Sequence, residues 1–240
     1  MEQLSMKTIP GLGIIIVAGG SSSRYGQKNK LFENLGGLPV FLHSIRNFAP
    51  FAEKDSLILV VPQGQADSFA EQIEKYLPQT EIKLAPGGSC RTESVKNGLA
   101  ALPSTTQIAA IHDAARPLAD GRLLLDLVNT VQTGNFGAIA AEKMIDSVCR
   151  TDSENDITES VARENLWRIQ TPQVFPYRAI CGAYRQLGDV ELTDDSSAAR
   201  ACGIKVKVCC NTRPNPKLTL PGDLSLLSYL LKNISSEKQD

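Results

Sequence analysis

The chain is short of the features that mark membrane, secreted and metal-rich proteins. Met1 to Pro10 lacks the charged and then apolar layout of a signal peptide, and the apolar run from Ile14 to Ala18 is far too short to cross a bilayer. The six cysteines form no Cys-x-x-Cys pair and only two histidines are present, so a structural zinc site is not expected. These absences predict a cytoplasmic protein with free, mostly buried thiols.

An excess of one charge sign is also lacking, since 25 basic residues stand against 26 acidic ones. A balanced surface attracts neither nucleic acid nor an anionic membrane, and neither is expected as a partner. Two common phosphate-binding signatures are missing as well: Gly-x-x-x-x-Gly-Lys-Ser/Thr and Gly-x-Gly-x-x-Gly. Their absence counts against a P-loop ATPase and against an NAD-dependent reductase.

What is present is an alternation of short β-branched runs with segments of helical spacing, in a chain of 240 residues that is 42% hydrophobic. This pattern predicts one α/β domain over residues 1–240, with a Rossmann-like, mostly parallel twisted sheet flanked by helices. Strands are expected at 14–17, 56–61, 81–85, 108–112, 137–141 and 205–210. Helices are expected at 41–48, 65–77, 91–102, 123–131, 177–187, after 193–195, and at 221–233.

The alternation breaks after Lys143. Residues 144–165 are polar, contain an acidic turn at 152–156, and carry two short candidate strands at 147–150 and 157–161. We therefore expect a β-hairpin that protrudes from the sheet.

The first predicted strand leads directly into the loop Ala18-Gly-Gly-Ser-Ser-Ser-Arg24. Its small side chains leave backbone N–H groups free at the carboxyl end of the strand, where open α/β sheets bind ligands. Arg24 and Lys30 supply two cations suited to a triphosphate. A tight turn beside a solvated basic surface explains the same residues, so the loop alone leaves both interpretations open.

Four segments together resemble the 2-C-methyl-D-erythritol 4-phosphate cytidylyltransferase family. They are the opening loop with Arg24 and Lys30, Pro86-Gly-Gly-Ser-Cys-Arg-Thr-Glu-Ser-Val95, His112-Asp-Ala-Ala-Arg-Pro117, and Leu166-Trp-Arg-Ile-Gln-Thr-Pro-Gln173 with Thr193-Asp-Asp195. The third segment is the most specific. The chain departs from the family pattern at Asn29, where proline is usual, without losing a charge.

The resemblance implies a reaction in which the phosphate of the sugar alcohol attacks the α-phosphorus of CTP and releases pyrophosphate. The product, CDP-methylerythritol, belongs to non-mevalonate isoprenoid precursor synthesis. Arg24 and Lys30 would stabilise the transition state, and Arg163 and Lys217 would hold the incoming phosphate. Magnesium, or another divalent cation, would bridge the phosphates of CTP near Asp113.

The resemblance also implies binding roles and an assembly. The nucleotide would contact Ala18, Gly19, Gly20, Ser21, Ser22, Gly87, Gly88, Ser94, Asp113 and Ala114. The sugar phosphate would contact Arg116, Asp146, Ser147, Arg163, Thr171 and Thr193. In this family the hairpin, here 144–165, is a dimerisation arm. A homodimer is therefore expected, with Arg163 of one subunit reaching the active site of the other.

Several alternatives stay open at the level of sequence. A ribitol 5-phosphate cytidylyltransferase would share the fold and mechanism, and a catalytically silent relative would bind CTP without transferring it. Arg116 has a structural explanation as an ion-pair partner. Thr171-Pro-Gln173 is interpreted as a rigid turn, and Thr193 or Asp194 as the cap of the helix that follows.

Overall fold

The computed structural model describes residues 8–19, 25, 29–188 and 190–236 and shows the predicted α/β architecture. A seven-stranded sheet has the order β11-β7-β10-β6-β1-β4-β5. Its strands are β1 (Leu12–Val17), β4 (Leu57–Val61), β5 (Lys83–Pro86), β6 (Ile108–Asp113), β7 (Gly137–Lys143), β10 (Trp167–Pro176) and β11 (Val206–Cys210). All neighbouring strands pair in parallel except β10, which runs antiparallel to both β6 and β7.

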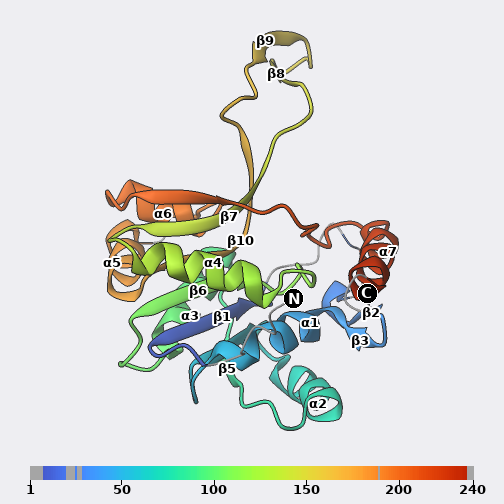
Figure 1. Cartoon of the computed structure of the whole chain (residues 1–240), viewed down its shortest axis with the longest axis vertical. Helices are drawn as coiled ribbons and strands as arrows, with labels where there is room; N and C mark the ends of the chain where they lie inside the picture. The colour runs from blue at the N-terminus through green and yellow to red at the C-terminus, as the bar shows by residue number, and fades with distance from the viewer. Residues whose placement is uncertain (1–7, 20–24, 26–28, 189, 237–240) are drawn as a thin grey trace.

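Helices cover both faces of this sheet (Figure 1). They are α1 (Val40–Phe48), α2 (Ala66–Tyr76), α3 (Arg91–Ala101), α4 (Gly121–Gln132), α5 (Tyr177–Leu187), α6 (Asp195–Ala201) and α7 (Asp223–Ser236). Every residue of β1 is buried, with Ile14 and Ile16 in one apolar cluster and Ile15 and Val17 in the other. Side chains of a strand alternate between faces, so a strand apolar at every position requires helices on both sides.

Short elements complete the chain. A 3-10 helix η1 (Lys30–Phe32) precedes the small ladder of β2 (Asn34–Leu35) and β3 (Leu38–Pro39), and a second 3-10 helix η2 (Ala49–Phe51) follows α1. Asn29 caps η1 by accepting a hydrogen bond from the Leu31 N–H at 3.1 Å. The residue that departs from the family's usual proline therefore still starts a defined turn at Lys30.

The predicted hairpin is present as β8 (Val148–Thr151) and β9 (Ile157–Val161). It leaves the sheet after β7, returns before β10, and stands far from the helices and strands of the main body (Figure 1). Most of its residues are exposed. We call residues 144–165 the arm.

The interpretation of Thr171-Pro-Gln173 as a turn is wrong, because these residues lie inside the ten-residue strand β10. The register of β10 against β7 shifts between Ile169 and Gln173, and the Thr171–Pro172 peptide is cis. An irregular strand of this kind tolerates proline at the point where the ladder is interrupted. The prediction missed β10 because it placed weight on the proline alone.

Helix α3 lies unusually close to the sheet. A Cβ atom on Gly98 would come within 2.5 Å of Ile15 Cγ2 and 2.9 Å of Val60 Cγ2. Only glycine permits this approach, so it sets the depth at which α3 packs over β1 and β4.

Candidate active site

Two glycine-containing segments meet at the carboxyl ends of the parallel strands. A Cβ on Gly19, after β1, would lie 2.9 Å from Ser94 Oγ and 3.6 Å from the Gly87 Cα after β5. The Ser94 hydroxyl accepts from the Gly88 N–H at 3.0 Å and donates to the Cys90 carbonyl at 2.9 Å. The structure thus brings together five predicted nucleotide-binding residues: Ala18, Gly19, Gly87, Gly88 and Ser94. Gly20, Ser21, Ser22 and Arg24 lie outside the described residues.

Asp113 lies next to these turns, at the end of β6 and in register with Val17. Its Oδ1 accepts from Arg91 Nε at 3.1 Å, and its Oδ2 accepts from Lys217 Nζ at 2.8 Å. Arg116 Nε is 4.0 Å from Oδ2. Burial alone would raise the pKa of Asp113, but Arg91 and the other two cations hold that pKa well below its usual range. The carboxyl group is therefore ionised at neutral pH.

Arg91 joins Asp113 to a second, fully buried carboxylate. Its Nη1 and Nη2 donate to Asp195 Oδ1 and Oδ2 at 3.1 and 2.8 Å, and the Tyr184 hydroxyl donates to Asp195 Oδ1 at 2.6 Å. Burial favours a lower pKa for Arg91, but the two aspartates raise it well above its usual value. Our sequence analysis gave Arg91 no role. One feature of the sequence could have indicated a role for Arg91: a cation in the first turn of a helix opposes the helix dipole and therefore needs negatively charged partners.

His112 organises the turn after β6 as a neutral group. The Thr171 hydroxyl accepts from the Asp113 N–H at 3.0 Å, so its own proton points to His112 Nδ1 at 3.1 Å. That leaves the ring proton on Nε2, which donates to the Arg116 carbonyl at 3.1 Å. Burial lowers the pKa of His112 to about 3. Thr171, a predicted substrate contact, thus has its hydroxyl engaged within the protein.

Arg116 is mostly buried and tied to the chain itself. Its Nη1 donates to the Asn215 carbonyl at 2.7 Å, and Asn215 Nδ2 in turn donates to the Thr171 carbonyl at 2.9 Å. These contacts agree with the structural alternative for Arg116 more directly than with a substrate contact. Thr193 stands just before α6, whose cap is Asp194, accepting from the Ser197 N–H at 3.1 Å.

Three of the remaining predicted residues lie on the arm, apart from the network of charges at Asp113. Asp146, Ser147 and Arg163 are exposed residues of the arm, and Arg163 Nη1 donates to the Ile145 carbonyl at 2.6 Å. Lys30 opens η1 and is half-buried. Ala114 follows Asp113, and its N–H donates to the Val17 carbonyl at 3.0 Å.

The donor set around Asp113 does not fit a protein-held divalent cation. Both carboxylate oxygens already face Arg91 or Lys217, and Arg116 adds a third positive charge. Across residues 8–19, 25, 29–188 and 190–236, no cluster of three His, Cys, Asp or Glu side chains is placed to hold a metal. A hard cation needs several oxygen ligands, which substrate phosphates supply and Asp113 alone does not.

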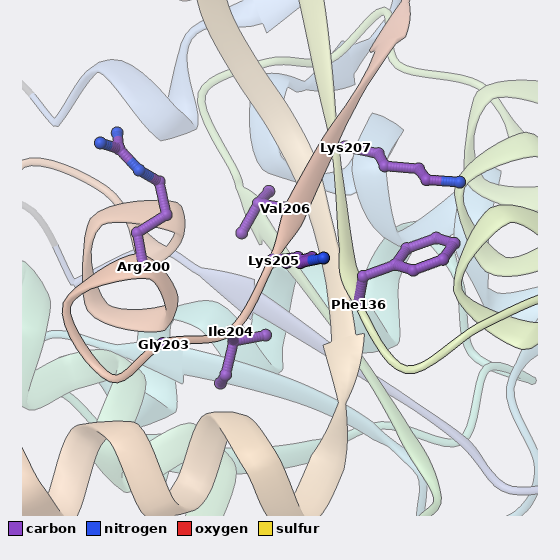
Figure 2. Close-up of a pocket in the computed structure, with 7 residues that line it drawn as sticks. All are labelled: Phe136, Arg200, Gly203, Ile204, Lys205, Val206 and Lys207. Atoms are coloured by element: carbon purple, nitrogen blue, oxygen red, sulfur yellow. The ribbon is translucent and has the colours of Figure 1, made fainter.

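A hollow of about 480 Å³ lies elsewhere, beside the edge strand β11. In Figure 2, Arg200 and Lys207 point to opposite sides of β11, and Lys207 Nζ lies 3.9 Å from the centre of the Phe136 ring. Its cations diverge, so they do not form a phosphate site. Edge strands commonly carry lysines that discourage pairing with other sheets.

No helix in the described part of the chain is both long and apolar enough to cross a bilayer. All six cysteines are free thiols, as predicted, but the expectation that they are mostly buried is wrong, because four are partly exposed and Cys149 and Cys210 are exposed.

Comparison with known proteins identifies the family to which the chain is similar. The family model described as "IspD: 2-C-methyl-D-erythritol 4-phosphate cytidylyltransferase" matches residues 12–233. The chain is 34% identical over 227 residues to the protein of that name from Syntrophus aciditrophicus, covering 93% of this chain and 97% of the relative. The counterpart from Nitrosospira multiformis is 32% identical over 225 residues, covering 91% and 97%.

A solved structure, 4-diphosphocytidyl-2C-methyl-D-erythritol synthase from Anaerococcus prevotii, superposes with a TM-score of 0.79 at 26% identity, covering 95% of this chain and all of that one. The fold agrees with the sequence match, which extends over nearly the whole chain. The chain belongs to the 2-C-methyl-D-erythritol 4-phosphate cytidylyltransferase family.

Proposed function

We propose that the chain transfers CMP from CTP to 2-C-methyl-D-erythritol 4-phosphate, giving CDP-methylerythritol and pyrophosphate. Membership of the family supports this activity. The observation that carries it in the structure is the contact of the Gly19 and Gly87 turns beside the Asp113–Lys217 pair. Two backbone turns suited to a nucleotide and a cation suited to a phosphate then lie at the carboxyl ends of parallel strands of the same sheet.

In the proposed reaction an oxygen of the sugar phosphate attacks the α-phosphorus of CTP, and the bond to the bridging oxygen of pyrophosphate breaks. The nucleophile is already an anion, so no general base is needed. The site agrees with this, because His112 has hydrogen bonds at both ring nitrogens and Asp113 is paired with cations. Catalysis then consists of positioning and charge neutralisation.

Lys217 is the described cation best suited to that neutralisation. Its side chain is 38% exposed, and its ammonium is held 2.8 Å from Asp113 Oδ2. An ammonium donates three hydrogen bonds, and among the described residues Lys217 uses one of them, on Asp113, which leaves two for phosphate oxygens. Arg24, Lys30 and Arg163 complete the proposed set. Magnesium remains a prediction, and we expect it to be carried by the triphosphate of CTP.

The turn at Gly87 and Gly88 is proposed to bind the cytidine. Glu93 holds this turn, because its Oε2 accepts from the Ser89 N–H at 2.6 Å and from the Ser89 hydroxyl at 2.8 Å. The Cys90 thiol in turn accepts from the Glu93 N–H at 3.5 Å. A turn fixed in this way presents backbone groups to a small pyrimidine at little entropic cost on binding.

We propose that the arm mediates a homodimer and brings Arg163 to the partner's site. The arm leaves Ile145 and Ile157 71% and 70% exposed, which is unusual for isoleucine. A two-stranded ladder is only marginally stable alone, so a partner surface over these side chains would support it. A cytoplasmic location also remains a prediction.

The function is tested by mixing the protein with CTP, magnesium and either methylerythritol 4-phosphate or ribitol 5-phosphate, and measuring pyrophosphate release. We expect release with methylerythritol 4-phosphate and at least tenfold less with ribitol 5-phosphate. The reverse preference would support the pentitol alternative, and CTP binding without release would support a silent relative. Lys30→Ala and Arg24→Ala should lower kcat far more than they weaken substrate binding.

A further inference from the structure

Four charged side chains alternate in sign from the interior of the protein to its surface. Asp195 has a fully buried side chain, and the side chains of Arg91, Asp113 and Lys217 are 23%, 11% and 38% exposed. The contacts between successive members are 2.8, 3.1 and 2.8 Å long. The sequence separates both Asp195 from Arg91 and Lys217 from Asp113 by 104 residues, so the fold assembles this series.

The buried end of the series is fixed in orientation. Asp195 is the first residue of α6, receives the Tyr184 hydroxyl, and binds Arg91 through both of its oxygens. A bidentate guanidinium–carboxylate pair sets the plane of the arginine as well as its distance. Arg91 is therefore held in one geometry before it reaches the site.

The third nitrogen of Arg91 determines how Asp113 is presented. Nε donates to Oδ1, which directs Oδ2 toward Lys217. Each of the three nitrogens of Arg91 donates one hydrogen bond to an aspartate, and its contact on the site side is with Asp113. The lysine, by contrast, has only one hydrogen bond to a side chain in the described part of the chain, and that is to Asp113.

We propose that Arg91, anchored by Asp195, is a positioning residue that orients Asp113 and thereby places the Lys217 ammonium for the incoming phosphate. The inference rests on the proposed role of Lys217. In this proposal α3 has two roles, because the helix follows the Gly87–Gly88 turn and also carries Arg91, which positions the groups that would bind the incoming phosphate.

Arg91→Lys tests this without burying an uncompensated aspartate, because the charge is kept while the fork that grips two carboxylates is lost. We expect kcat/KM for methylerythritol 4-phosphate to fall about 10- to 100-fold, with a much smaller change in the KM for CTP. Leu99→Ala is the matched control for stability, since it truncates a buried apolar side chain of the same helix. Arg122→Lys is the control for the substitution itself, at an exposed position on α4.

A double-mutant cycle separates positioning from general destabilisation. Lys217→Ala should cost about 100-fold or more in the wild-type background, but only a few-fold when Arg91 is already lysine. Wild-type kinetics of Arg91→Lys, additive losses, or an equal loss in an equally destabilised Leu99→Ala would each overturn the inference. Wild-type kinetics of Lys217→Ala would instead refute the role of Lys217, and the inference with it, while pyrophosphate release by the unmodified protein would still uphold the transferase activity.

Discussion

The ion pairs at Asp113 and the pair on the arm all join a carboxylate to a basic side chain, but they differ in what surrounds them. Asp113 is 8% exposed and faces three cations. Arg150 and Glu159 on the arm form one pair at 2.9 Å, with side chains 70% and 60% exposed. Water screens the exposed pair, whereas the buried charges depend on one another. The positions of the charged groups are therefore fixed at the carboxyl end of β6 and adjustable on the arm.

The apolar residues show the same contrast. All six residues of β1 are buried, while β9 has four exposed residues of five. The main body buries the side chains of its central strands, although a few apolar side chains outside the arm, such as Tyr229 and Val190, are also exposed. The arm has a ladder and a turn but little of its own to pack on, which fits a segment completed by another molecule.

The largest expected effect is at the centre of the buried network. Asp113→Leu would leave Arg116 and Lys217 without their carboxylate partner, and Arg91 with Asp195 alone. We expect a loss of about 3–5 kcal/mol in the free energy of unfolding and no detectable pyrophosphate release. Urea denaturation followed by fluorescence measures the first. An unfolding midpoint equal to that of the wild type would contradict the interdependence of these charges.

Arg163→Ala tests whether the arm contributes to activity. We expect kcat/KM for the sugar phosphate to fall about 100-fold, equivalent to about 2.7 kcal/mol, while stability changes by less than about 0.5 kcal/mol. Mixing it with Lys30→Ala should restore some activity through hybrid dimers. If equimolar mixtures stay as inactive as either variant alone, Arg163 does not act across subunits.

The pH dependence of stability tests whether His112 is buried as a neutral group. Its pKa is lowered to about 3 from an ordinary value near 6.5. Between those values the unfolded chain binds the extra proton and the folded one does not, so stability falls as pH decreases from about 6.5 toward 3, by at most about 1.4 kcal/mol per pH unit. His112→Gln should flatten that slope in urea titrations at pH 4.5–7. Burial lowers the pKa of His43 as well, so part of the slope should persist.

The smallest effect is expected from the exposed pair. Arg150→Ala should change the free energy of unfolding by about 0.5 kcal/mol or less, because both side chains are solvated. Thermal unfolding at low and at high salt is the measurement. A loss as large as that of Asp113→Leu would mean that the arm is as rigidly organised as the carboxyl end of β6.

The features that could be predicted from the sequence are those determined by residues close together along the chain. Continuous apolar runs located the parallel strands, and the polar stretch after Lys143 located the arm. Strand β10 was interpreted as a turn because of its proline, and its buried polar residues, most of whose partners are distant in the sequence, give no apolar pattern that would have indicated a strand. Gln173 bonds to Asp194 and to the Ser196 N–H, and Gln170 accepts from Asn211. Asp113 was predicted as a site residue, but its pairing with Arg91 and Lys217 requires the assembled fold.

Gly98 shows how far from the substrate the determinants of such a site extend. It lies seven residues, or about 10 Å, along α3 from Arg91, on the face that packs against Ile15 and Val60. A methyl group there would lift the helix from the sheet and move Arg91 away from Asp113. We therefore expect the residue at this position to be restricted by the geometry of the proposed site as well as by packing. Gly98→Ala should lower the activity of a protein that still folds.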